Sequence, residues 1–151
     1  MKTIVTILTL LLFMFPAALL AETYPEIDIK KIAAERKAIV EDYMQLSEQE
    51  SAVFWPLYNE YDKMLQTSFS RYKALISDYM QAHEHLSDKK AKELMTELLA
   101  IQADDLKHKQ AYAQKFSDKL PHKRVFQYFV LEEQFAAGFF AVITENLPPI
   151  K

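Results

Sequence analysis

The chain has 151 residues, a formal net charge of −3, one glycine and no cysteine. The lack of cysteine excludes disulfides, Cys-ligated zinc, c-type haem attachment and thiol catalysis. The balance is slightly acidic and the charges are spread along the chain. This argues against nucleic acid as a partner, since that would call for a basic patch or a high pI.

Residues 1–21 have the pattern of a secretory signal peptide that is removed from the mature protein. Lys2 supplies the positive charge at the start, an apolar run follows, and residues 16–21 resemble a cleavage region. The alternative is an uncleaved membrane anchor, but the apolar stretch is at the short limit for spanning a bilayer and contains Pro16. We therefore expect a periplasmic protein whose mature part, residues 22–151, is one domain with no stable membrane span.

The single glycine predicts an all-α fold, because sheets and loop-rich folds use glycine in their turns. Apolar residues recur at helical spacing along the mature chain. The expected helices run from residue 28 to about 45, from 47 to about 83, from 87 to about 120, and from 122 to about 146. The long second and third helices are expected to form an antiparallel helical hairpin.

The second expected helix begins with a recognisable cap. Leu46 precedes Ser47, which can cap the helix while Glu50, three residues on, reaches back to the Ser47 amide. Pro56 lies inside the same helix and predicts a kink, because proline removes the hydrogen bond to the carbonyl four residues earlier. Two compatible interpretations remain: the kink lets a long helix curve around its neighbours, or it shapes a concave aromatic surface.

The last two expected helices each carry an apolar stripe, and Glu133 falls within the second stripe, where we expect it to be partly buried against a basic partner. Residues 134–144 carry no charge and fit either a buried segment or an oligomer interface, so a homodimer is expected to hide the apolar surplus. The two predicted core stripes consist of Ala91, Leu94, Met95, Leu98, Leu99, Gln102, Leu106, Ala113, Phe116 and Leu120, and of Phe126, Phe129, Ala136, Phe140, Ile143 and Leu147.

These features resemble the Spy/CpxP group of periplasmic stress proteins, which is marked by two LTxxQ motifs. The first motif corresponds to residues 46–50, LSEQE, where serine and glutamate preserve the capping chemistry. The second would be residues 120–124, LPHKR, which keep the leucine alone. The resemblance implies a thin, curved helical homodimer, a cradle, whose members include ATP-independent chaperones, proteins that restrain an envelope-stress sensor kinase, and metal-binding proteins.

The resemblance and the aromatic content together predict function. Seventeen of the 19 aromatic residues lie after Ala21, and long helices cannot bury both faces of all of them. We predict a periplasmic, ATP-independent chaperone-like or envelope-stress protein that binds unfolded or partner polypeptides on a concave apolar face. The candidate partner-binding residues are Phe54, Trp55, Tyr58, Tyr61, Phe69 and Tyr72.

Two alternatives remain open, and catalysis is not expected. A zinc-type resistance or sensor protein would use His83 and His85, although residues two apart on a helix point to different sides. A specific adaptor would bind one partner, such as the periplasmic domain of a sensor kinase. The adjacent carboxylates Asp104–Asp105 and Glu132–Glu133 diverge on their helices, so neither pair suggests an acid and base. We expect no cofactor.

Overall fold

The computed structural model describes residues 28–150, which form four α-helices and one 3-10 turn, with no strand in this range. The all-α prediction of about four helices is confirmed, and the predicted ends lie within three residues of the observed ones. The predicted signal peptide lies outside the described residues. The elements are α1 (Ile29–Met44), α2 (Glu48–Ala82), η1 (His83–His85), α3 (Asp88–Ser117) and α4 (His122–Asn146).

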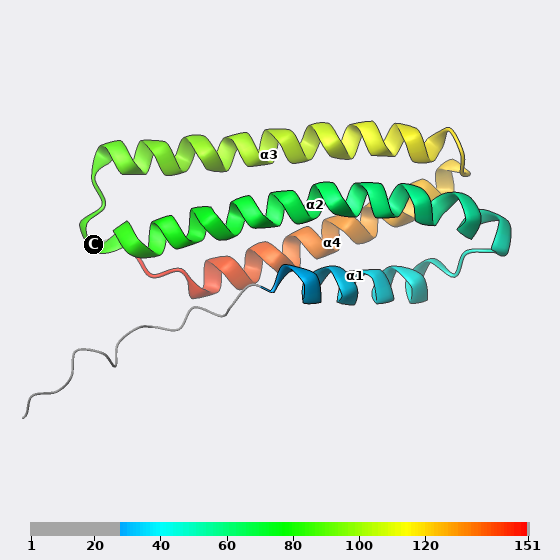
Figure 1. The fold of residues 1–151 in the computed structure, drawn as a ribbon, viewed down its shortest axis with the longest axis horizontal. Helices are drawn as coiled ribbons and strands as arrows, with labels where there is room; N and C mark the ends of the chain where they lie inside the picture. The colour runs from blue at the N-terminus through cyan, green and yellow to red at the C-terminus, as the bar shows by residue number, and fades with distance from the viewer. Residues whose placement is uncertain (1–27, 151) are drawn as a thin grey trace, which may run out of the picture.

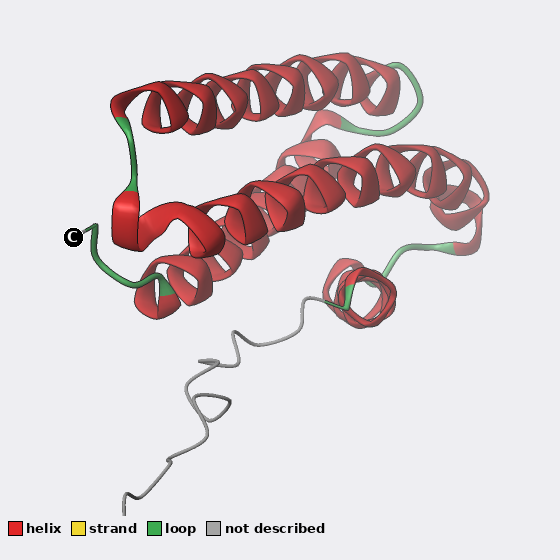
Figure 2. Ribbon diagram, turned by 60° about the vertical axis from the view of Figure 1, so that its left-hand side comes forward, coloured by secondary structure: helices red, strands yellow, loops and turns green. Residues whose placement is uncertain are grey.

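The predicted helical hairpin is formed by α2 and α3, which run antiparallel side by side (Figure 1). Ion pairs join the two helices, with Arg71 Nε 2.9 Å from a Glu97 carboxylate oxygen and Lys90 Nζ 2.7 Å from Asp78. The shorter α1 packs against α2 and α4, and Figure 2 shows it nearly end-on beneath them. None of the described helices is long and apolar enough to cross a membrane.

Helix α4 follows a different course from the hairpin. It leaves α3 through a short connection at one end of the molecule and then diverges from it, so the two helices are close together only near that connection (Figures 1 and 2). Ring contacts bridge α4 and α2 along their length, for example Phe54 to Tyr128 at 5.1 Å and Tyr72 to Phe140 at 5.3 Å between ring centroids.

The predicted capping box at the start of α2 is confirmed. The Ser47 hydroxyl accepts from the Glu50 amide at 3.2 Å, and a Glu50 carboxylate oxygen accepts from the Ser47 amide at 2.9 Å. The Ser47 amide and then Arg124, whose Nε donates to Glu50 at 2.9 Å, hold the pKa of Glu50 below its usual range. The cap therefore also joins the start of α2 to the start of α4.

The bend predicted at Pro56 is visible near the beginning of α2. Pro56 lies inside the helix with its ring exposed, and the first turns of α2 bend away from the axis of the rest (Figure 1). The missing amide hydrogen and the bulk of the ring account for the change of direction. The aromatic residue Phe54, in the part of α2 before the bend, packs against Phe116 of α3 and Tyr128 of α4.

The core lies at the end of the molecule where α3 turns into α4. Phe54, Phe116 and Tyr128 are at the centre of this core, with their ring centroids 5.1 to 5.3 Å apart. Aliphatic side chains from α1, α2, α4 and the connection between α3 and α4 surround the rings, and α3 adds Tyr112. The buried cluster comprises Val40, Met44, Phe54, Leu57, Tyr58, Tyr61, Tyr112, Phe116, Leu120, Val125, Tyr128 and Leu131.

The predicted core face of α4 was wrong in part. Phe126 is 73% exposed, and the buried positions are Val125, Tyr128, Leu131, Glu132 and Ile143. Glu133 was expected to be partly buried, but its side chain is 63% exposed and pairs with Lys109 at 2.6 Å. The buried carboxylate is its neighbour Glu132. Because α1 packs on α4 as well, the buried sector is displaced around the helix from the position that the apolar stripe predicted.

The predicted core stripe of α3 was also wrong in part. Met95, Leu99 and Leu106 are 55%, 57% and 56% exposed, whereas Ile101 and Phe116 are fully buried. Helix α3 packs on α2 along its length, but α4 departs from it after the connection (Figure 1). The side of α3 that a close-packed α4 would cover is therefore left open.

Candidate functional site: an apolar groove between α2, α3 and α4

The structure places most of the predicted partner-binding aromatic residues in the interior. Phe54, Tyr58 and Tyr61 are each 1% exposed and Tyr72 is 5% exposed. Burial raises the pKa of Tyr72 to about 12, since the charged form would lose its solvation. These four side chains pack the helices together, so they do not form an open face.

The remaining two predicted residues are half-buried and already have partners. The Trp55 ring lies edge-on to Phe54 at 5.1 Å, with the Lys37 ammonium 5.5 Å from its centre. Phe69 packs against Phe139 at 4.9 Å between ring centroids. We therefore assign the candidate binding surface to a different part of the fold.

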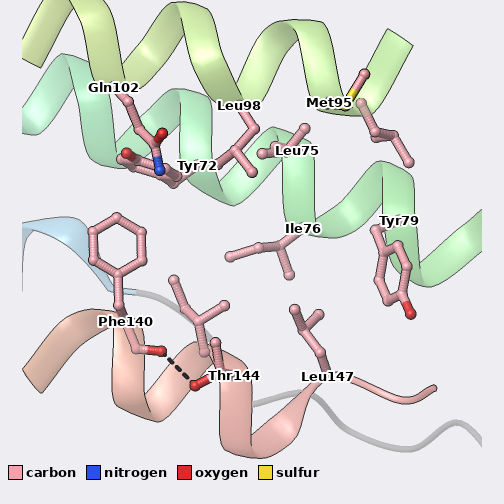
Figure 3. A pocket seen from close by; sticks show the side chains of 12 residues that line it. Tyr72, Leu75, Ile76, Tyr79, Met95, Leu98, Gln102, Phe140, Thr144 and Leu147 are labelled. Carbon is pink, nitrogen blue, oxygen red and sulfur yellow. Dashed lines mark hydrogen bonds between the residues drawn. The ribbon is translucent and has the colours of Figure 1, made fainter. Parts of the chain in front are cut away.

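That surface is a half-open apolar groove at the end of the molecule away from the core. Helix α2 forms its floor, and the diverging α3 and α4 form its walls around a cavity of about 290 Å³ (Figure 3). Figure 3 shows side chains from the three helices pointing toward one another across this space. The main lining residues are Tyr72, Leu75, Ile76 and Tyr79 of α2, Leu94, Met95, Leu98 and Gln102 of α3, and Phe140, Ile143, Thr144 and Leu147 around the end of α4.

Nearly all the polar atoms that line the groove are already hydrogen-bonded within the chain. The Tyr72 hydroxyl donates to Asp105 at 3.4 Å, and the Tyr79 hydroxyl donates to the Pro148 carbonyl. The Thr144 hydroxyl donates to the Phe140 carbonyl at 2.9 Å, as the dashed line in Figure 3 marks. Gln102 is the lining side chain whose amide has no partner within residues 28–150. The groove thus offers apolar contact and few hydrogen bonds.

The groove continues into an exposed, mostly apolar stripe on α3, which we call the α3 seam and which consists of Met95, Leu99, Gln102 and Leu106. Their spacing of four, three and four residues places them on one face of the helix. Met95 and Gln102 line the groove, and Leu99 and Leu106 extend the same face beyond it. Sequence periodicity detected this stripe, but assigned it to the core because it could not show that α4 turns away.

An ion pair marks the narrow end of the space between α3 and α4. Lys109 Nζ lies 2.6 Å from a Glu133 carboxylate oxygen, one turn of α3 beyond Leu106. On the core side of this pair, α3 and α4 are joined through Phe116 and Phe129, whose ring centroids are 6.1 Å apart. The contacts between α3 and α4 are therefore on the core side of the groove, and the groove itself lies beyond them.

A buried charge cluster ties α1 to the rest of the bundle. Arg36 donates to Glu132 through Nη2 at 2.6 and 2.8 Å, and to Asp62 through Nη1 at 3.1 Å. Burial acts to lower the pKa of Arg36, but the attractions of Glu132, of the two buried tyrosines Tyr58 and Tyr128, and of Asp62 together outweigh it, and the pKa is raised. Burial raises the pKa of Glu132, more than Arg36 lowers it. Both side chains are closed off from solvent, so this cluster has a structural role.

The histidines considered as metal ligands lie in the turn after α2. His83 and His85 fall within η1, and His83 Nδ1 is 2.8 Å from the Met80 carbonyl oxygen. Across residues 28–150, no group of three or more histidine, aspartate or glutamate side chains lies together in a way that could hold a metal ion. The metal alternative gains no geometric support from these residues.

Comparisons of the chain with family models, with curated proteins and with solved structures found no match. No relative therefore supplies a function for this chain. The groove and the α3 seam are the features of the described residues that support a functional proposal.

Proposed function

We propose that this protein binds apolar segments of other polypeptides in the groove between α2, α3 and α4, as an ATP-independent, chaperone-like protein of the cell envelope. The observation that carries the proposal is the exposed α3 seam beside an open apolar cavity. Three large apolar side chains more than half exposed on one helix face are typical of an interaction surface. The signal-peptide pattern of residues 1–21 and the resemblance to Spy/CpxP proteins support the envelope location.

The dimensions of the groove favour weak, exchangeable binding. From Tyr72 to Tyr79 its floor covers two turns of α2, which is about 11 Å. A stable, specific interface buries about 800 Å² on each partner, far more than a groove of this length provides. Apolar contact with few hydrogen bonds also gives little preference for one sequence. Both properties suit transient holding of varied clients.

An aggregation assay tests the proposal. The purified protein, without ATP and at near-stoichiometric amounts, should slow the aggregation of several chemically denatured clients. The double variant Leu99→Lys/Leu106→Lys should lose most of this protection, because it places two charges on the α3 seam. Ile39→Lys is the matched control, since Ile39 is 47% exposed on α1 and does not line the groove.

Two outcomes would contradict the proposal. One is a lack of protection for every client, which would favour an adaptor that recognises a single envelope partner. The other is an equal loss of protection in the Ile39 variant and the α3 seam variant, which would show that general surface hydrophobicity and not the groove holds clients.

A further inference from the structure

We propose that the groove takes its partner segment as an α-helix, with the apolar face of an amphipathic helix lying along the α3 seam. This inference rests on the proposed function and specifies the class of ligand. Its basis is the hydrogen-bonding capacity of the lining, the spacing of the seam, and the divergence of α3 from α4.

The hydrogen-bonding capacity of the groove is the first reason. An extended peptide that enters an apolar groove loses water from its backbone amides and carbonyls, and these groups then need partners from the protein. The three hydroxyl groups in the lining already donate their hydrogens within the chain: Tyr72 to Asp105, Tyr79 to the Pro148 carbonyl, and Thr144 to the Phe140 carbonyl. A helical segment brings its backbone hydrogen bonds with it, so it can be buried without partners from the lining.

The secondary structure of the binding surface leads to the same conclusion. Proteins that bind extended peptides by their backbone usually offer the edge of a sheet. The described residues contain no strand, and the groove is built from α2, α3 and α4. A surface built from helices suits the mode in which a helix lies in a groove, with anchors three, four and seven residues apart.

The α3 seam has the spacing that a partner helix requires. The four-three-four separation of Met95, Leu99, Gln102 and Leu106 is the alternation by which one helix packs against another in a coiled coil. From Met95 to Leu106 the seam is about 17 Å long, which matches a partner helix of about three turns. Since α4 diverges from α3 at this point, a fifth helix would complete the packing that the four helices leave open (Figure 1).

The size of the groove argues against a second copy of this chain as the occupant. A surface one helix wide and about 17 Å long, which is the length of the α3 seam, offers less than the about 800 Å² per partner that a stable dimer buries. A single helical segment matches the length of the α3 seam and the weak affinity that we expect. The proposal therefore commits to a helix of another polypeptide.

Binding of designed peptides to the full protein tests the inference. One fluorescein-labelled peptide of about 18 residues carries leucines at helical three-four spacing among alanine, lysine and glutamate. A second has the same composition except for two central prolines, which prevent the helix. Fluorescence anisotropy should show binding of the first peptide that is at least tenfold tighter than that of the second. Circular dichroism should show helix gained by the first peptide on binding.

Variants of the protein test whether the peptide binds along the α3 seam. Leu99→Lys and Leu106→Lys should each weaken binding of the helical peptide about tenfold, and Ile39→Lys should leave it unchanged. All three positions are exposed, so the variants are expected to fold, and circular dichroism checks that they do. Unchanged binding in both α3 seam variants would overturn the assignment of the site.

The remaining outcomes separate this inference from the proposed function. Equal binding of both peptides, with aggregation protection intact, would overturn the helical mode and leave the chaperone-like function standing. No peptide binding and no protection would overturn both. A concentration-dependent dimer in sedimentation, abolished by Leu99→Lys, would show that a second copy covers the groove and would also overturn the inference.

Discussion

Arg36 and Glu132 are 96 positions apart in the chain, yet one guanidinium nitrogen of Arg36 lies 2.6 and 2.8 Å from the two carboxylate oxygens of Glu132. Each side chain is 5% exposed, and Asp62 of α2 shares the same guanidinium at 3.1 Å. One residue of α1 thereby contacts both α2 and α4 in the interior. Charge pairing, as well as apolar contact, determines where α1 packs.

Removing one partner of this pair should strongly destabilise the fold. Glu132→Ala leaves the Arg36 guanidinium buried with Asp62 alone, and we expect a loss of about 3 to 5 kcal/mol in the free energy of unfolding. Urea denaturation followed by circular dichroism at pH 7 measures it. The adjacent Glu133→Ala is the control, because its exposed pair with Lys109 should contribute less than about 1 kcal/mol. Similar losses in the two variants would contradict the structural role.

The double variant Arg36→Met/Glu132→Leu should recover most of the stability that Glu132→Ala loses, since a buried ion pair can be replaced by apolar side chains.

Buried tyrosines should make the protein sensitive to alkali. Burial raises the pKa of Tyr72 to about 12, and it raises those of Tyr58, Tyr61 and Tyr128 well above the ordinary value of tyrosine. The folded state then holds these protons more tightly than the unfolded state, whose tyrosines titrate near pH 10. Their contribution to stability is complete below about pH 10 and is lost as the pH rises through the folded pKa values.

An alkaline titration checks this prediction. Absorbance at 295 nm reports tyrosinate, and far-ultraviolet circular dichroism reports helix. A fraction of the tyrosines should ionise only as the helices unfold, so the two signals should change together above about pH 11. Complete ionisation with the helices intact would show that the interior is open to hydroxide and would refute the prediction.

Replacing the single glycine should stabilise the isolated protein. Gly138 lies inside α4 without a positive φ, and an added Cβ would meet no atom within 4 Å. Gly138→Ala should raise the free energy of unfolding by about 0.5 to 1 kcal/mol, because alanine has the higher helix propensity. Differential scanning calorimetry should show a Tm higher by about 4 °C. A lower Tm that depends on protein concentration would instead indicate that a second copy packs against Gly138, as in the homodimer that the sequence led us to expect.

Local sequence signals were sufficient for the helices and their ends. The capping box of Ser47 and Glu50 involves residues three apart, so it could be recognised without knowledge of the fold, and the structure confirms it. The starts of the last two helices depend on equally local features: Pro121 precedes α4, and the Ser87 hydroxyl accepts from the Lys90 amide at the start of α3. Each of these features depends on a few neighbouring residues.

The position of each helix relative to its neighbours could not be predicted in the same way. On α4 the apolar residues occupy so much of the helix surface that periodicity alone could not show which sector faces inward. The sequence therefore predicted that Glu133 is partly buried, whereas the buried carboxylate is Glu132. Met95 and Leu99 were assigned to the core because an apolar stripe usually has a covering helix. Whether α4 covers that stripe depends on the direction in which α4 leaves Pro121, which no local pattern encodes.

The divergence of α3 from α4 gives the two ends of the molecule different mechanical properties. At one end of the molecule the packed rings of Phe54, Phe116 and Tyr128 join α2, α3 and α4. The ion pair of Lys109 and Glu133 joins α3 to α4 next to these rings. Beyond that pair, within residues 28–150, each helix is held by α2 and not by the other: Arg71 pairs with Glu97 of α3, and the Tyr79 hydroxyl donates to the Pro148 carbonyl after α4. A change in the direction of α4 at Glu133 would therefore displace Leu147 more than it displaces the residues of the core, and would change the width of the groove without disturbing the packed rings.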